Sequence, residues 1–195
     1  MEQIHTLTTA AAEAAACRLC AAHLPLGPRP TFRVSETACI LIIGQAPGTK
    51  VHATGIPWND PSGDRLRLWL SLDRDTFYDQ SRIAIVPMGL CYPGRLPQGG
   101  DAPPRPECAP LWLDRFVRLM PQIRLTLLVG SYALRHRLGP GAMTDRVRRF
   151  AELGPAIMPL PHPSWRTSGW ERRNPWFGDE LLPVLRSAVK QVLDL

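Results

Sequence analysis

The chain has 195 residues, 45% of them hydrophobic, which suits one globular domain whose core folds unaided. Its formal net charge is +6, and of 23 basic residues only Lys50 and Lys190 are lysines. No apolar run approaches the ~18 residues of a membrane span or resembles a signal peptide, so a cytoplasmic protein is expected. Arginine binds phosphate through paired hydrogen bonds, which favours a nucleic-acid partner, although a GC-rich genome would produce the same bias.

Helical and strand-like segments alternate along the chain. An Ala-rich helix is predicted over residues 1–16, and four short apolar runs indicate strands buried on both faces, at residues 39–43, 83–86, 125–129 and 156–160. Further helices are predicted after a cap at Ser62 and over residues 108–120, 132–138, 143–153 and 179–193. This order predicts an α/β fold, a three-layer α/β/α sandwich with a mainly parallel four-stranded sheet, as one domain over residues 1–195.

Two polar turns follow predicted strands. The first strand breaks into Gly44-Gln45-Ala46-Pro47-Gly48 instead of continuing as a helix, and the fourth runs into His162-Pro163-Ser164-Trp165. In a parallel sheet both turns lie at the carboxyl edge, where open α/β sheets bind ligands. Glycines there allow a ligand to approach the backbone closely. The sequence therefore predicts a pocket, whereas the glycine-rich turn alone would also suit an ordinary loop.

These segments also carry a family resemblance. Gly44 to Gly48, then Gly55-Ile56-Pro57-Trp58, and His162-Pro163-Ser164 resemble the motif series of the uracil-DNA glycosylase superfamily. The nearest match is its iron-sulfur branch, the family 4 and 5 enzymes of bacteria and archaea, over residues 17 to about 176. The resemblance implies a DNA glycosylase that acts as a monomer and excises uracil or a related deaminated base from DNA. Only Lys50 lies near a motif, so a lyase step through an amine nucleophile is not expected.

Four cysteines are similar to the branch's cluster ligands. Cys17 and Cys20 form a C-x2-C pair, and Cys91 and Cys108 are separated by 16 intervening residues in a Pro/Gly-rich loop. Four thiolates hold either a 4Fe-4S cluster or a tetrahedral zinc ion, and either pair alone would suit unconnected structural thiols. The resemblance favours a structural 4Fe-4S cluster, since base excision transfers no electrons. Cys39, inside a predicted strand, is expected to be a small core residue.

The resemblance also assigns roles in breaking a base–sugar bond. The flipped base needs an aromatic partner, assigned to Trp58, and a donor to its oxygen, assigned to His162; a core tryptophan and a structural histidine are the alternatives. A carboxylate must orient water or stabilise a cationic sugar. The best-known branch has its Asp at the position of Ala46, whereas some family 5 enzymes match Asp60; Asp64 is the rival. Gln45 is expected near the base or water, and the remaining base-binding set is Gly44, Ala46, Pro47 and Asn59.

One position departs from the pattern. The iron-sulfur families usually carry an Asn four residues before the third cluster cysteine, where its amide reads the uracil edge, but this chain has Pro87. Proline offers neither a side-chain amide nor a backbone donor, and Asn59 and Asn174 are the chain's only asparagines. The site would then read uracil through backbone groups, accept another base such as hypoxanthine, or bind nucleic acid without catalysis.

The segment after His162 interleaves arginines with aromatic residues. In the family this loop enters the DNA minor groove, with a side chain such as Trp165 or Trp170 as the wedge. The expected DNA contacts are Ser164, Trp165, Arg166, Arg172 and Arg173. Trp176 and Phe177 are expected to anchor the last helix instead. An iron-sulfur sensor or interaction protein on the same scaffold is a third alternative.

Overall fold

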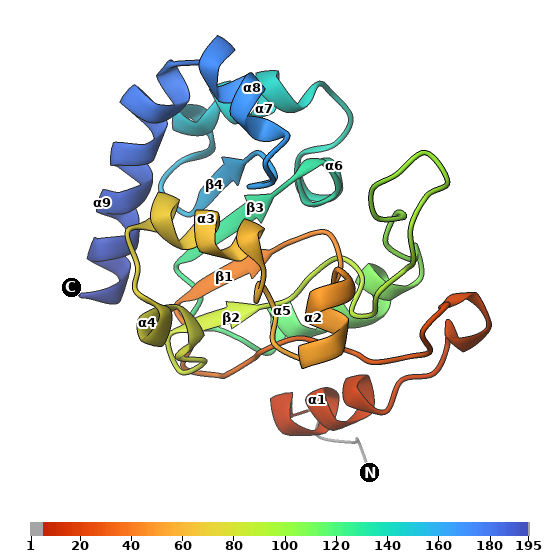
Figure 1. Cartoon of the computed structure of the whole chain (residues 1–195). Coiled ribbons are helices and arrows are strands. Elements are labelled where there is room, and N and C mark those ends of the chain that lie inside the picture. Colours follow the sequence, from red (N-terminus) through yellow and green to blue (C-terminus); the bar gives the residue numbers. More distant parts are fainter. Residues whose placement is uncertain (1–5, 195) are drawn as a thin grey trace.

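The computed structural model describes residues 6–194 and is built on one sheet (Figure 1). Its strands are β1 (Ile40–Ile43), β2 (Ile83–Ile85), β3 (Leu125–Val129) and β4 (Ile157–Leu160), all parallel, in the order β2-β1-β3-β4. In register, Ile42 pairs with Ile85 on one side and Leu127 on the other. All four predicted strands are confirmed, and none differs from its prediction by more than one residue at an end.

Helices surround this sheet (Figure 1). They are α1 (Leu7–Ala15), α2 (Thr49–Thr54), α3 (Pro61–Leu70), α4 (Arg74–Tyr78), α5 (Asp114–Arg118), α6 (Ser131–Leu138), α7 (Met143–Arg148), α8 (Thr167–Arg173) and α9 (Leu182–Leu193). Short 3-10 turns occupy Ala21–His23 and Phe150–Leu153, and π-helical turns at Ala109–Leu113 and Phe177–Leu181 precede α5 and α9. Helix α3 packs against α9, and α1 packs against α5.

The core explains why the strands read as continuous apolar runs. Every residue of β1, from Ile40 to Ile43, is at most 1% exposed, so both faces of this central strand are covered. Phe177 is buried and its ring meets that of Trp69 edge-on, with centroids 4.9 Å apart, while Trp176 packs against the core. Both aromatic residues therefore anchor the last helix as predicted. Cys39 packs beside the core just before β1.

Several helix ends differ from the prediction. Asp60, not Ser62, caps α3: its side chain accepts a hydrogen bond from the backbone N–H of Gly63, and Pro61 takes the first helical position. The helix predicted over residues 143–153 breaks after α7, because Arg149 leaves the helical conformation. Helix α1 begins after a Thr6 cap, and residues 1–5 of its predicted range lie outside the described residues.

Three short helices were not predicted, namely α2, α4 and α8. Helix α2 continues the turn after β1 for six residues and ends at Gly55, whose φ of 69° is left-handed. The glycine-rich segment thus does include a helix, although a brief one. Within residues 6–194, none of the helices has the length and apolar character needed to cross a membrane.

Candidate active site

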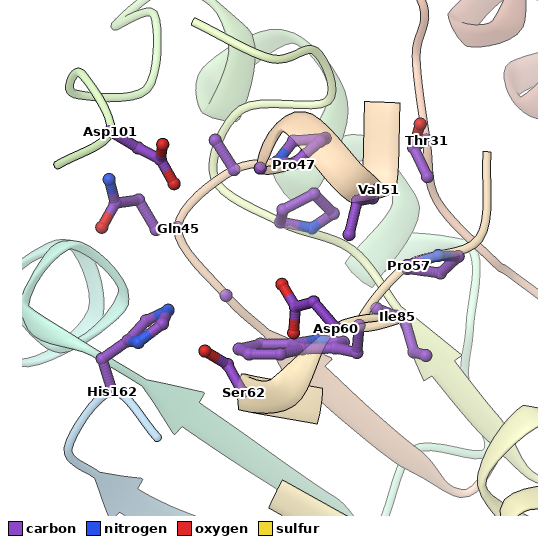
Figure 2. A pocket seen from close by; sticks show the side chains of 15 residues that line it. Thr31, Gln45, Pro47, Val51, Pro57, Asp60, Ser62, Ile85, Asp101 and His162 are labelled. Atoms are coloured by element: carbon purple, nitrogen blue, oxygen red, sulfur yellow. The ribbon is translucent and has the colours of Figure 1, made fainter. Parts of the chain in front are cut away.

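A cavity of about 100 Å³ lies at the carboxyl edge of the sheet (Figure 2). The turn after β1, the segment between α2 and α3, the segment after β2, and the segment after β4 all contribute to its walls. The residues that line it are Thr31, Gly44, Gln45, Ala46, Pro47, Gly48, Val51, Pro57, Trp58, Asp60, Ser62, Ile85, Pro87, Asp101 and His162. The two polar turns that the sequence placed at one edge therefore meet in a single pocket.

Trp58 forms an aromatic wall of this pocket and is held there by two glycines. Its φ of 56° lies in the left-handed region, which a bulky residue adopts only where its surroundings enforce it. A Cβ on Gly63 would lie 1.7 Å from the Trp58 carbonyl oxygen, and one on Gly44 would lie 2.8 Å from Cζ2 of the indole ring. The absence of side chains at both positions allows the indole to lie in the pocket.

Asp60 both caps helix α3 and places its carboxylate at the pocket. Its Oδ1 accepts the capping hydrogen bond from Gly63 at 2.8 Å, which orients the carboxylate at the pocket wall and at the positive end of the α3 dipole. The rival, Asp64, lies one turn further on, is exposed, and pairs with Arg67 outside the pocket. Of these two carboxylates, the structure brings only Asp60 to the site.

His162 faces the same cavity from the end of β4 (Figure 2). Its ring centroid lies 5.7 Å from that of Trp58, with the planes tilted by 36°. Burial lowers the pKa of His162 below its usual value, against the opposing effect of the carboxylates of Asp60 and Asp101. The backbone is held as well, because the Thr167 hydroxyl donates a hydrogen bond to the His162 carbonyl. The site therefore presents a neutral imidazole near pH 7.

The other predicted base-binding residues divide into two groups. Gly44, Gln45, Ala46 and Pro47 line the pocket, and Gln45 Nε2 donates a hydrogen bond to the Ala102 carbonyl at 3.3 Å. Asn59 is not among the lining residues, because its Oδ1 accepts a hydrogen bond from Arg74. Pro87 lines the pocket without contributing a donor.

The loop after His162 is fastened to α3 by Arg65. This guanidinium donates to the Ser164 carbonyl at 3.0 Å and the Ser168 hydroxyl at 2.9 Å, and it pairs with Glu171 at 2.8 Å. Close to these contacts of Arg65, Trp165 is 79% exposed. Trp165 and Asp60 both line a shallow groove. The Arg166 guanidinium lies over the indole of Trp165. Arg172 and Arg173 are exposed at the end of α8.

The four cysteines gather around a second, separate pocket. Cys17, Cys20, Cys91 and Cys108 all line it, together with Arg105 and Trp112. The backbone N–H of Leu90 donates to Cys108 Sγ at 3.2 Å. Burial raises the pKa of Cys91, and that of Cys108 to about 12. In residues 6–194, however, no three His, Cys, Asp or Glu side chains are arranged to hold a metal ion.

Besides the lining residues Thr31 and Val51, sequence reasoning missed three residues that charge or position the site. Asp101 lines the pocket from a loop noticed only for its cysteines, and Arg65 and Gly63 lie in a helix predicted from a cap at Ser62. Gly63 left a signal, because a glycine within the first turn of a helix commonly has a packing reason. No local pattern indicated the contacts of Asp101 or Arg65.

The comparison with known families agrees with this geometry. The sequence model described as the uracil DNA glycosylase superfamily matches residues 32–186. That range contains the whole sheet and every pocket residue except Thr31. It excludes Cys17 and Cys20 and does not distinguish among branches of the family.

Gly63→Ala is expected to displace Trp58 and to destabilise the protein by about 1–3 kcal/mol, because the added Cβ collides with a backbone carbonyl. Gly178→Ala is the matched control, since a Cβ there meets nothing within 4 Å. Urea denaturation measures stability. Quenching of tryptophan fluorescence, measured with and without an added Trp58→Phe substitution, isolates the exposure of Trp58 from that of the other five tryptophans. Equal effects of the two glycine substitutions on both measurements would contradict the packing argument.

The pKa of His162 predicts a pH-dependent stability. Because burial lowers it in the folded protein, the unfolded chain binds the proton more readily. Its contribution is complete above about pH 6.5 and is lost as the pH falls toward the folded pKa. His162→Gln should therefore show a smaller decrease in the free energy of unfolding between about pH 7.5 and pH 5.5. An unchanged pH dependence in His162→Gln would refute the prediction.

Proposed function

Because the chain belongs to the uracil DNA glycosylase superfamily, we propose that it is a DNA glycosylase that hydrolyses the bond between uracil, or another deaminated base, and its sugar. The observation that carries the proposal is the convergence of Trp58, Asp60 and His162 on one cavity. An aromatic face, a carboxylate and a largely buried imidazole are the three groups that such a reaction needs at one place.

The reaction begins with a base that has left the duplex, since the bond is inaccessible within the stack. Trp58 stacks on the extruded base. As the bond breaks, the base gains negative charge and the sugar becomes cationic. The N–H of neutral His162 donates a hydrogen bond to the base oxygen, and the carboxylate of Asp60 stabilises the sugar.

The size of the cavity supports a one-ring base. A cavity of about 100 Å³ is on the scale of the ~150 Å³ apolar cavity that accepts a benzene ring in another protein. Uracil suits that volume better than the two-ring hypoxanthine. Since Pro87 supplies no amide, the base edge must be read by other pocket groups.

The product depends on whether the pocket supplies an amine nucleophile. A lyase step requires an amine that forms a Schiff base. Lys50 is exposed on α2, and no lysine is among the described residues that line the pocket. The enzyme therefore leaves an abasic site in an intact strand. Trp165 and the neighbouring arginines are the surface that would hold the DNA and fill the gap in the stack.

A second candidate function is a binding protein for damaged or single-stranded nucleic acid. Ala46 and Pro87 favour it, because they stand where better-known relatives carry the catalytic Asp and the Asn that reads the base edge. The exposed Trp165 and its arginines would serve binding equally well. Base release distinguishes the two functions.

The test measures base release from labelled single- and double-stranded oligonucleotides that contain uracil, hypoxanthine or xanthine. His162→Ala and Asp60→Asn are expected to lower the rate about a hundredfold or more while DNA binding is retained. Asn caps helices as well as Asp does, so Asp60→Asn should fold normally, whereas Asp60→Ala should lose about 1 kcal/mol of stability. Asp64→Asn is the matched control and should remain active. Tight binding to every oligonucleotide without release would establish the binding protein instead.

We also propose that the four cysteines hold a 4Fe-4S cluster. The kind of donor supports the proposal: four thiols line one pocket, and the Leu90 N–H is directed at Cys108 Sγ, as is usual around cluster sulfurs. Binding would have to draw the four thiols together, because within residues 6–194 they are not arranged around a single ion. The cluster would supply a structural link between residues 17–20 and the loop that runs from Cys91 to Cys108. Base hydrolysis needs no electron transfer, so no redox step is assigned to it.

Anaerobically purified protein should contain iron and sulfide, and Cys108→Ser should lose both together with thermal stability. Cys39→Ser is the control, because Cys39 lies outside the cysteine pocket and should keep its iron. Elemental analysis and visible absorption make the measurement. If the protein contains zinc and no iron, the four cysteines form a zinc site and not a cluster. If it contains neither metal, the assignment of the four cysteines as ligands is wrong.

A further inference from the structure

Asp101 is a second carboxylate at the pocket that holds Asp60 and His162. Its side chain points into the cavity above Gln45 and His162 (Figure 2). A Cβ on Gly48, in the turn after β1, would lie 3.5 Å from Asp101 Oδ2. Asp101 comes from the loop between β2 and α5, so its carboxylate reaches over the turn from a distant part of the chain.

The backbone on both sides of Asp101 is fixed. The Leu96 N–H donates to the Gly100 carbonyl at 3.0 Å, and the Ala102 N–H donates to the Gly94 carbonyl at 2.9 Å. Gln45 then ties the Ala102 carbonyl to the turn after β1. This loop therefore presents Asp101 to the pocket in a defined position, although the residue as a whole is solvent-exposed.

Four titratable side chains affect the pKa of Asp101. Partial burial of the carboxyl raises its pKa, and Asp60 adds to this, while Arg95, His162 and Arg166 oppose it. Within residues 6–194 no side chain makes a hydrogen bond to the carboxylate, whereas Asp60 has one oxygen engaged in capping α3. An acidic group beside Arg166, on the expected DNA face, also repels phosphate. A carboxylate there weakens DNA binding, so its presence suggests that it takes part in the reaction.

We propose that Asp101 is a catalytic base that binds the attacking water and accepts its proton, leaving Asp60 to stabilise the cationic sugar. This inference rests on the glycosylase function proposed above. Enzymes that break glycosidic bonds commonly use two carboxylates in different surroundings, each with its own role in the reaction. Asp60 is oriented by its cap bond, and Asp101 is free to bind water at the mouth of the pocket.

The step balances in atoms and charge. The water oxygen forms a bond to the anomeric carbon of the sugar, and the bond from that carbon to the base nitrogen breaks, with its electron pair leaving on the base. The proton of the water passes to Asp101. The base anion, hydrogen-bonded by His162, then takes a proton from solvent, and Asp101 returns its own proton to solvent.

The test compares single-turnover base release by the full chain and its Asp101→Asn, Asp101→Ala and Asp101→Glu variants. Asp101→Asn is expected to be slower by about a hundredfold or more with unchanged or tighter DNA binding. Added formate should restore part of the activity of Asp101→Ala, and Asp101→Glu should retain part of it. The ratio of wild-type to Asp101→Asn rates should shrink as the pH falls, because protonated Asp101 is no longer a base. Asp75→Asn, an exposed acid on α4, is the control.

Three outcomes would overturn the inference, and they do not mean the same thing. Active wild-type protein with an equally active Asp101→Asn variant, or an inactive Asp101→Ala variant that folds but gains nothing from formate, rejects Asp101 as the base and leaves the glycosylase intact. Wild-type protein that releases no base from any oligonucleotide rejects the proposed function and the role of Asp101 together. Circular dichroism and DNA affinity show that each variant is folded.

Discussion

The close approach of the Trp58 carbonyl to Gly63 is the constraint on which the pocket depends. The carbonyl occupies the space that any other side chain at position 63 would fill, and the left-handed backbone of Trp58 brings the indole against Gly44. The same contact places Asp60 where it caps α3. An aromatic wall, a helix start and a carboxylate are thus fixed together, so a strained backbone at Trp58 is retained for the site it builds.

The distribution of charge differs between the pocket and the surface around it. The chain is basic overall, yet two carboxylates, Asp60 and Asp101, lie at the cavity beside a partly buried histidine. Burial lowers the pKa of His162, so in the proposed reaction it would donate a hydrogen bond as a neutral imidazole and add no positive charge beside the sugar. Arg166, Arg172 and Arg173 are exposed outside the pocket, where phosphate would be bound. Opposite charges are therefore separated between the pocket and its surroundings.

The reactive groups lie on loops, and long-range contacts make those loops rigid. Arg65 fastens the segment after His162 to α3, and Gln45 fastens the loop of Asp101 to the turn after β1. The cysteine pocket joins the N-terminal segment to the other end of that loop. A site built on loops needs such bracing, because catalytic groups must hold their positions within fractions of an ångström.

The sequence by itself determined the sheet and the place of the site. Strands covered on both faces leave continuous apolar runs, and parallel topology brings the turn at Gly44 and His162 to one edge. Only the tertiary structure decided that Asp60 caps α3 in place of Ser62, that Asn59 turns to Arg74, and that Asp101 reaches the pocket. Local patterns record periodicity and burial, whereas the direction of a loop side chain is set by hydrogen bonds and close contacts between residues far apart in the chain.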